Sequence, residues 1–246
     1  MKFSIITVCF NSEKTIEETL RSVSSQNYEN VEHIVIDGGS SDDTLCIVNN
    51  FKHVTKIISE KDKGIYDAMN KGINLAEGNV IGFLNSDDVF YSENIIKDYF
   101  NDFIKYEADI VYGDLIFTSS SGKKNIRKWH SSSYEVNKLG TGWIPPHPTF
   151  YAKKSLFEHL GNFDTNFKFA SDFDLMTRFL LSNNSVTKYS KGYKVKMRYG
   201  GATTKNLKNI YLGNLEIIRA LKKNNIKRDR YFLLKKFLNK IFQFFK

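Results

Sequence analysis

Short apolar runs alternate with stretches of helical spacing through the first half of the chain. The runs are rich in β-branched residues and reach at most seven residues: Ser4–Val8, Val31–Asp37, Lys56–Ser59, Val80–Leu84 and Ile110–Tyr112. Runs of this kind are typical of buried strands, and helices between successive strands are typical of parallel pairing. The sequence therefore predicts an α/β fold with a largely parallel sheet.

The composition fits a folded domain. Of the 246 residues, 41% are hydrophobic, which is enough for a substantial core. The two cysteines, Cys9 and Cys46, provide neither a disulfide framework nor zinc-site spacing, which favours a reducing compartment. No apolar stretch approaches the roughly 20 residues that cross a bilayer. The run Phe3–Phe10 is followed at once by polar residues, so we expect a buried strand there and no signal peptide.

Helical spacing returns in the second half, after a segment rich in Ser, Gly and Lys. The expected helices cover Lys153–His159, Asp172–Leu181, Leu207–Lys223 and Asp229–Phe244. We expect a main domain over residues 1–205 and a C-terminal helical extension over residues 206–246. In the first half, hydroxyl side chains favour helix starts after Ser12 and after Ser40 or Ser41.

The two halves of the chain carry opposite charge. Residues 1–120 hold 10 Lys and Arg against 20 Asp and Glu, whereas residues 121–246 hold 26 against 7. A basic half with interleaved Phe and Tyr also suits a non-enzymatic nucleic-acid binder, in which cations contact phosphates and rings stack on bases. Such a binder leaves the carboxylate clusters of the acidic half without a function, so we expect the chemistry there.

Two adjacent carboxylates, Asp87 and Asp88, follow the apolar run Val80–Leu84 within the segment Asn85–Asp88. Such a pair repels itself unless a cation joins it, and Mg²⁺ prefers one or two carboxylates together with substrate phosphates. In open α/β sheets, ligands bind where the strands reach their carboxyl ends. The pair therefore indicates a metal and diphosphate site, although a turn or a helix cap explains the same sequence.

A second polar segment follows the run Val31–Asp37. Asp37 precedes two Gly and two Ser, which permits a tight turn that directs backbone amides and the Asp37 carboxylate towards a base or ribose. The spacing matches neither the dinucleotide-binding nor the P-loop pattern. A strand-turn-helix junction with a capping Ser is the structural alternative.

Two helix candidates carry polar residues at functional positions. The segment EKDKGIYDAMNKGI enters a helix through Asp62 and Gly64, and one face presents Asn70. The segment ASDFDLMTRF places Asp172 in a first helical turn, where the dipole favours a carboxylate for structural reasons alone. Asp172 can therefore be a helix cap or a catalytic base.

Together these segments resemble a known enzyme family. The order TVCFN, IDGGSSDDT, DKGIYDAMNKG, FLNSDD and HPTFY, followed by ASDFDLMTR, is similar to that of the inverting glycosyltransferases of family 2 over residues 3 to 200. The resemblance implies the GT-A fold, in which a Rossmann-like and mostly parallel sheet is flanked by helices. It also implies that the donor is a nucleotide-diphosphate sugar.

The resemblance implies roles for individual residues as well. The nucleotide and donor pocket would contain Thr7, Val8, Asn11, Asp37, Asp62, Gly64, Asn70, Asn85 and Asp87. Asp88 would be the metal ligand and Asp172 the general base, and Trp143 and His147 would lie on the acceptor side. Asn85 stands where the acidic motif of the family commonly opens with Asp, which lowers the expected metal affinity.

The implied reaction is a single displacement at the anomeric carbon, assisted by Mn²⁺ or Mg²⁺. The Q-x-x-R-W sequence of processive synthases is absent, which favours transfer of one sugar. We expect hexosyl or N-acetylhexosaminyl transfer, from a UDP-sugar to a glycan or lipid-linked acceptor, in cell-surface polysaccharide or lipopolysaccharide synthesis. The alternative enzyme is a nucleotidyltransferase, which needs a Gly-rich loop with a basic residue near the first strand, where only Lys14 occurs.

The end of the chain is basic and amphipathic. Residues 219–246 hold ten Lys and Arg against one acid, Asp229. The apolar residues recur at three- and four-residue steps: Leu234, Phe237, Leu238, Ile241 and Phe245. Such a helix can lie on an anionic bilayer, so we expect a cytoplasmic enzyme attached peripherally to the inner face of the cell membrane. Packing of the apolar stripe on the domain, or a homo-oligomer contact, is the alternative.

Overall fold

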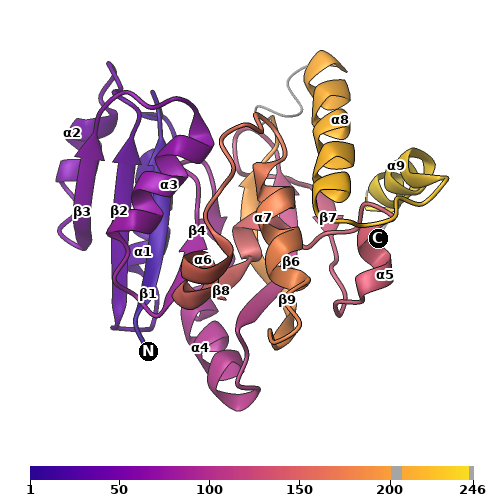
Figure 1. Ribbon diagram of the computed structural model, residues 1–246. Coiled ribbons are helices and arrows are strands. Elements are labelled where there is room, and N and C mark those ends of the chain that lie inside the picture. The colour runs from indigo at the N-terminus through magenta and orange to yellow at the C-terminus, as the bar shows by residue number, and fades with distance from the viewer. Residues whose placement is uncertain (201–206, 244–246) are drawn as a thin grey trace.

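The computed structural model describes residues 1–200 and 207–243 (Figure 1). Its strands are β1 (Phe3–Cys9), β2 (Val31–Asp37), β3 (Val54–Ser59), β4 (Val80–Phe83), β5 (Val89–Phe90), β6 (Ile110–Thr118), β7 (Asn125–Trp129), β8 (Tyr151–Lys153) and β9 (Thr187–Arg198). They form one sheet in the order β3-β2-β1-β4-β8-β6-β9-β5, and β7 pairs with β6 outside this path. The pairs β3–β2, β2–β1, β1–β4 and β6–β9 are parallel, whereas β4–β8, β8–β6, β6–β7 and β9–β5 are antiparallel.

Helices flank this sheet (Figure 1). In the described residues they are α1 (Ile16–Ser24), α2 (Thr44–Asn49), α3 (Ile65–Leu75), α4 (Ile95–Lys105), α5 (Val136–Leu139), α6 (Lys154–Leu160), α7 (Ser171–Leu180), α8 (Leu207–Lys223) and α9 (Phe232–Phe242), with a 3-10 turn η1 (His147–Thr149).

Alternation along β1 and β2 assigns the helices to two faces. Ile6 and Val8 pack in one core with α3, α6 and α7. Phe3 and Ile5 point to the opposite face, where they pack with α4. On that second face, Val35 of β2 packs with α1 and α2. Both faces of the central strands are thus buried, which explains their nearly continuous apolar sequence.

The α/β fold and the parallel start of the sheet confirm the prediction from the sequence. The second half of the sheet is mixed, because β8 lies antiparallel between β4 and β6. The expected hydroxyl caps are wrong. Thr15 and Asp43 occupy the N-cap positions of α1 and α2, and neither makes a side-chain capping bond.

Residues 207–243, which we call the C-terminal arm, run along α7 and then past β7 (Figure 1). Ala220, Leu221 and Phe232 of the arm are buried against Phe167 and Phe173. The backbone N–H of Lys128 in β7 donates to the carbonyl of Gln243 at 3.0 Å. The helix expected over Leu207–Lys223 is confirmed as α8.

The boundary expected between residues 205 and 206 lies outside the described residues, as does the expected end of the last helix at Phe244. Across residues 1–200 and 207–243, none of the helices is both long enough and apolar enough to span a membrane.

Candidate active site

The acidic segment between β4 and β5 contains a buried carboxylate. Asp88 is fully buried, and neither carboxylate oxygen has a hydrogen-bond partner among the described residues. Burial raises the pKa of Asp88 well above its usual value and the charge of Asp87 raises it further, while the nearby Arg198 acts in the opposite direction. Burial also raises the pKa of Asp87. Such a carboxylate is costly unless a proton or a cation joins it.

Asp37 shapes the loop after β2. Its buried carboxylate accepts hydrogen bonds from the backbone N–H groups of Gly39 at 3.2 Å and Ser40 at 3.0 Å, and from the hydroxyls of Ser40 and Ser59. Gly39 has a φ of 82°, a conformation that favours glycine. The Asp37 carboxylate thus already has hydrogen-bond partners within the protein. Direct contact of Asp37 with a nucleotide stays a prediction.

Gly38 and Asp62 bring the end of β2 against the segment that precedes α3. A Cβ on Gly38 would lie 2.5 Å from Oδ2 of Asp62 and 3.5 Å from the Phe10 ring. Asp62 accepts a hydrogen bond from the backbone N–H of Gly64, at 2.8 Å, where α3 starts. Phe10 is 62% exposed beside these groups, and an exposed ring at this edge can stack on a base.

Of three expected pocket residues near the end of β1, two are buried and one is exposed. The side chains of Thr7 and Val8 are buried in the sheet, and the Thr7 hydroxyl donates to the carbonyl of Leu84 at 2.7 Å. Asn11 is exposed, has a φ of 49°, and accepts the backbone N–H of Ser41 at 2.9 Å. Thr7 and Val8 can therefore shape a pocket only through the strand that carries them, whereas Asn11 lies on the exposed edge.

Asn70 connects α3 to the segment that precedes α7. Its Nδ2 donates to the carbonyl of Phe163 at 2.9 Å, and its Oδ1 accepts the Phe163 N–H at 3.0 Å. Both polar ends of the amide are therefore used within the protein. Contact of Asn70 with the nucleotide stays a prediction. The order of the segments gives no sign of this bond, because Phe163 lies 93 residues away in the chain.

Asp172 lies in the first turn of α7 and is partly exposed. Its Oδ1 accepts the backbone N–H of Phe173 at 2.8 Å and the hydroxyl of Tyr66 at 3.2 Å. Burial raises the pKa of Tyr66 well above its usual value, and the negative charge of Asp172 raises it further. Tyr66 is therefore a neutral donor that holds one oxygen of Asp172.

Aromatic packing connects Asp172 with the carboxyl end of β4. Phe163 stacks on Tyr66, with ring centroids 5.4 Å apart, and meets Phe83 and His147 edge-on. His147 in turn stacks on Phe83, the last residue of β4, at 5.4 Å. One packed aromatic group thus connects Tyr66, which bonds to the candidate base, with the strand that leads into the acidic segment.

His147 and Trp143 lie in the segment between α5 and β8. Burial lowers the pKa of His147, and the charge of Asp172 partly opposes this shift. The His147 Nε2 is buried without a hydrogen-bond partner in the described residues. Trp143 stacks on Tyr134 and meets Tyr112 edge-on. The assignment of His147 and Trp143 to the acceptor side remains an expectation.

The C-terminal arm supplies a site residue that the sequence analysis missed. Lys236 of α9 donates to Oδ1 of Asn214 at 2.7 Å. Burial lowers the pKa of Lys236 to about 8, the charge of Lys240 lowers it further, and attraction to Asp172 opposes the shift. The only sequence signal is a lysine in a basic helix, which predicts exposure. Phe10 and Tyr66 were also missed, although both lie within segments that carry the family resemblance.

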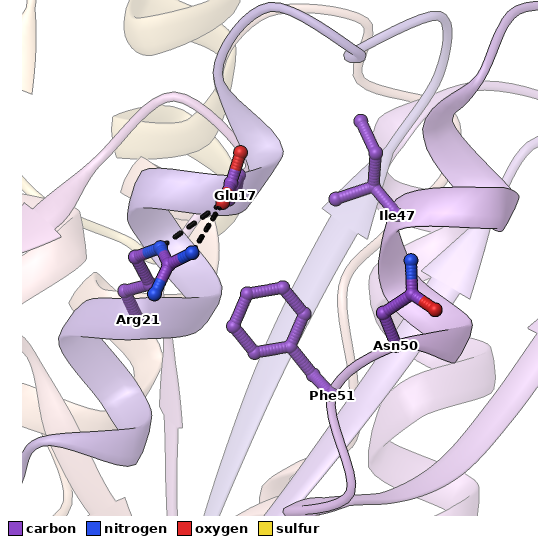
Figure 2. Close-up of a pocket in the computed structure, with 5 residues that line it drawn as sticks. All are labelled: Glu17, Arg21, Ile47, Asn50 and Phe51. Carbon is purple, nitrogen blue, oxygen red and sulfur yellow. Dashed lines mark hydrogen bonds and ion pairs between the residues drawn. The ribbon is translucent and has the colours of Figure 1, made fainter.

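The helical surface over β1 and β2 has a depression of about 360 Å³ between α1 and α2 (Figure 2). It is lined by Glu17, Arg21, Ile47, Asn50 and Phe51. The Arg21 guanidinium bonds to Glu17 at 2.6 Å and lies 5.7 Å from the centre of the Phe51 ring. Its cation is therefore already paired, and the depression contains none of the expected site residues.

Known proteins resemble this chain in sequence and in fold. Residues 4–177 match the family described as glycosyl transferase family 2. A "PGL/p-HBAD biosynthesis glycosyltransferase" of Mycobacterium bovis is 30% identical over 192 residues, which cover 76% of this chain and 73% of the relative.

Solved structures show the same fold at lower identity. TarS of Staphylococcus aureus has a TM-score of 0.70 at 21% identity, and the match covers 99% of this chain but only 44% of TarS. A shorter TarS structure, solved in complex with UDP-GlcNAc, also gives 0.70 at 21%, with 99% and 73% covered. The mannosyltransferase PcManGT of Pyrobaculum calidifontis, in complex with GDP-Man and Mn²⁺, gives 0.64 at 16% identity, with 89% and 64% covered.

These likenesses identify the mixed α/β sheet as the GT-A fold. The nucleotidyltransferase and the nucleic-acid binder are accordingly set aside. The chain is a glycosyltransferase and belongs to glycosyl transferase family 2.

Proposed function

We propose that this enzyme transfers one sugar from a nucleotide-diphosphate sugar, with a UDP-sugar as the expected donor, to a hydroxyl of a glycan or lipid-linked acceptor. The transfer inverts the anomeric carbon, depends on a divalent metal and serves cell-surface polysaccharide synthesis. The observation that carries the proposal is a pair of carboxylates in unlike surroundings. Asp88 is buried without a hydrogen-bond partner for its carboxylate in the described part of the chain, whereas Asp172 is partly exposed and held by hydrogen bonds. The UDP-GlcNAc complex of TarS and the GDP-Man and Mn²⁺ complex of PcManGT support the donor class and the metal.

Asp172 acts as the general base in this proposal. Tyr66 and the backbone N–H of Phe173 hold its Oδ1, which leaves Oδ2 to accept the proton of the acceptor hydroxyl. The acceptor oxygen bonds to the anomeric carbon as the bond from that carbon to the diphosphate breaks. One in-line attack inverts the configuration, and the nucleoside diphosphate leaves. The charge of Arg198, which forms an ion pair with Glu18, also offsets part of the negative charge of Asp87 and Asp88.

The residues of the acidic segment fit a divalent cation. Both oxygens of Asp88 and the Oδ1 of Asn85 are buried oxygen atoms without partners in the described residues. Within those residues, no group of three or more His, Cys, Asp or Glu could hold a metal ion. Asp88 would therefore hold the ion with phosphate oxygens and water as the other ligands, the arrangement that Mg²⁺ commonly takes. When bound, the metal neutralises charge on the diphosphate leaving group.

A donor screen tests the proposed function. The melting temperature is measured with UDP-, GDP-, CMP- and ADP-sugars, each with Mn²⁺ and with EDTA, because a ligand that binds the native state raises it. We expect a UDP-sugar to raise the melting temperature with Mn²⁺ and to lose most of that effect with EDTA. NMR of the product then gives the anomeric configuration, and a retained configuration would contradict the single displacement.

We also propose that the enzyme works at the inner face of the cell membrane, through an exposed apolar face of α9. Leu233, Leu234, Phe237 and Leu238 are 41–61% exposed. The turn that leads into α9 and its first turn add Lys227, Arg228, Arg230 and Lys235. Exposed apolar side chains beside basic ones suit the interface of an anionic bilayer.

Vesicle flotation tests this placement. Removal of the whole helix would also remove Phe232, which is 1% exposed and packs in the core of the arm. Leu234→Glu with Phe237→Glu changes only exposed positions, and we expect it to abolish flotation with anionic vesicles at low salt. Ile104→Glu, at an exposed apolar position of α4, is the matched control and should float like the wild type. A wild type that ignores anionic vesicles would overturn the placement.

A further inference from the structure

Helix α7, which carries Asp172, begins without a cap of its own. Its N-cap residue is Ala170, which makes no side-chain capping bond. The first N–H groups of a helix and of the turn before it need acceptors, and Ser, Thr, Asp or Asn usually supplies one at the N-cap. Ala170 cannot do so. The N–H of Phe173, in the first turn, donates to Asp172, and the N–H groups of the turn before the helix find their acceptor elsewhere in the chain.

Glu216 of α8 supplies that acceptor. Its Oε1 accepts the backbone N–H of Lys168 at 3.0 Å, and its Oε2 accepts those of Phe169 at 2.7 Å and Ala170 at 3.0 Å. A carboxylate at this position is also favoured by the dipole of α7. Three charge-assisted hydrogen bonds therefore fix the backbone immediately before Asp172.

A second contact with α8 holds the same turn from inside. Asp174 is fully buried and accepts bonds from the Arg178 Nε at 3.0 Å, the Lys223 Nζ at 3.1 Å and the Asn224 Nδ2 at 3.0 Å. Lys223 also bonds to Asp164 at 2.8 Å, in the segment that leads to α7. The segment before Asp172 thus bonds to Glu216 in the middle of α8, and Asp174, just after it, bonds to Lys223 at the end of α8.

Apolar packing also holds α8 against the segment that leads into α7. Phe167 and Phe173, on either side of the Glu216 contact, are buried against Leu221 and Phe232 of the arm. Gly142 makes room for the arm, because a Cβ there would lie 2.6 Å from the Phe232 ring. This packing holds α8, and with it Glu216, against the segment that leads into α7.

From these contacts we infer that Glu216 is a positioning residue, which holds the start of α7 so that Asp172 meets the acceptor hydroxyl at the angle that proton transfer needs. The inference rests on the proposed role of Asp172 as the base. It gives the C-terminal arm a part in catalysis although Glu216 touches neither donor nor acceptor. Because misplacement of a catalytic group by about 1 Å can cost on the order of 100-fold, loss of the three Glu216 bonds should be visible in turnover.

A double-mutant cycle tests the inference in the full-length enzyme. We expect Glu216→Ala to lower kcat by roughly 10- to 100-fold while the Kd of the donor changes by less than about twofold. Glu216→Gln, which keeps an acceptor oxygen, should recover part of the loss. Added to Asp172→Asn, Glu216→Ala should lower kcat by less than about twofold more, because its effect passes through Asp172.

Two control variants separate positioning from general loss of stability. Glu158→Ala changes an exposed glutamate of α6 and should leave kcat unchanged. Val48→Ala changes a buried residue of the α1–α2 core and should lower the melting temperature while leaving kcat unchanged. Losses of kcat that simply multiply in the cycle would show a structural role for Glu216 and overturn the inference.

Amide hydrogen exchange gives a readout that needs no activity. Glu216→Ala should speed exchange of the backbone amides of Lys168, Phe169 and Ala170 at least about tenfold relative to amides of β1. Unchanged exchange would overturn the inference whatever the kinetics show. If instead exchange increases but Asp172→Asn transfers sugar at the wild-type rate, the assignment of the base fails and the inferred role of Glu216 fails with it.

Discussion

At the scale of single residues, the candidate site separates two carboxylates by what surrounds them. Asp88 is buried, and no residue that the structure describes forms a hydrogen bond with its carboxylate, so its environment favours a proton or a cation. Asp172 has two donors on one oxygen and remains partly exposed, so its environment favours an oriented base that a substrate can reach. The difference in burial, which sequence does not reveal, supports different roles for two residues of the same type.

Removal of the Asp172 carboxylate tests its role. We expect Asp172→Asn to keep donor binding and to lower kcat by about 10² to 10⁴, the range that loss of a general base usually costs. Tyr66→Phe removes only the hydroxyl that orients Oδ1 and should cost less, about tenfold. Steady-state rates with saturating donor measure both. An Asp172→Asn variant with the wild-type rate would move the base to another residue.

Removal of the Asp88 carboxylate tests the metal site. In the presence of Mn²⁺, Asp88→Ala should weaken donor binding by about tenfold or more, because the ion that holds the diphosphate is lost. In EDTA the variant and the wild type should bind the donor equally weakly. Calorimetric titration measures both conditions, with Asp102→Ala on α4 as a carboxylate control. Equal losses with and without metal would mean that Asp88 contacts the donor directly.

At the scale of elements, the sequence predicts the first four strands because their apolar runs are short and separated by helical spacing. It does not predict β9, whose polar sequence TKYSKGYKVKMR is stabilised by pairing with β6 and β5, far away in the chain. The same holds for the candidate site, where the sequence predicts some residues and misses the contacts of others. Asp62 and Asp88 can be inferred from local motifs, but the contacts of Asn70 with Phe163 and of Glu216 with Ala170 join distant segments.

The packing of α3 on β1 gives a prediction at this scale. A Cβ on Gly72 would lie 2.4 Å from Cγ2 of Ile6. Helix propensity favours Ala over Gly by about 1 kcal/mol, but overpacking costs about 1–3 kcal/mol. We expect Gly72→Ala to lower the free energy of unfolding, as measured in urea. Asn74→Ala, at an exposed position of the same helix, should change it little. A more stable Gly72→Ala variant would show that α3 can move away from the sheet.

At the scale of the whole molecule, the acidic and basic halves of the chain meet at the site. The acidic half supplies Asp88 at the carboxyl edge of the sheet, and the basic half supplies the arm with Lys223 and Lys236. Composition alone suggests a nucleic-acid surface for the second half. The fold shows instead that two of its cations, Lys223 and Arg178, form ion pairs with Asp164 and Asp174 inside the protein.

A buried histidine makes the stability of the whole fold depend on pH. His33 of β2 is fully buried, with its Nε2 2.9 Å from the Thr7 hydroxyl and its Nδ1 3.1 Å from Nε2 of His53. Burial and the charge of His53 lower the pKa of His33 to about 3. In the unfolded chain the value is about 6.5. Between these values the unfolded state binds more protons, so the free energy of unfolding falls as the pH falls.

The size of this effect follows from proton linkage, at about 1.4 kcal/mol for each pH unit below 6.5. We expect His33→Gln, which cannot take up the proton, to be less stable than the wild type at pH 7.5. The difference should shrink by about 2 kcal/mol at pH 5, because only the wild type loses this contribution. Urea unfolding at both pH values measures it, with His159→Gln, at an exposed position of α6, as the control. If the difference in unfolding free energy is the same at both pH values, His33 takes up a proton in the native fold, and the contact between β2 and His53 opens to allow it.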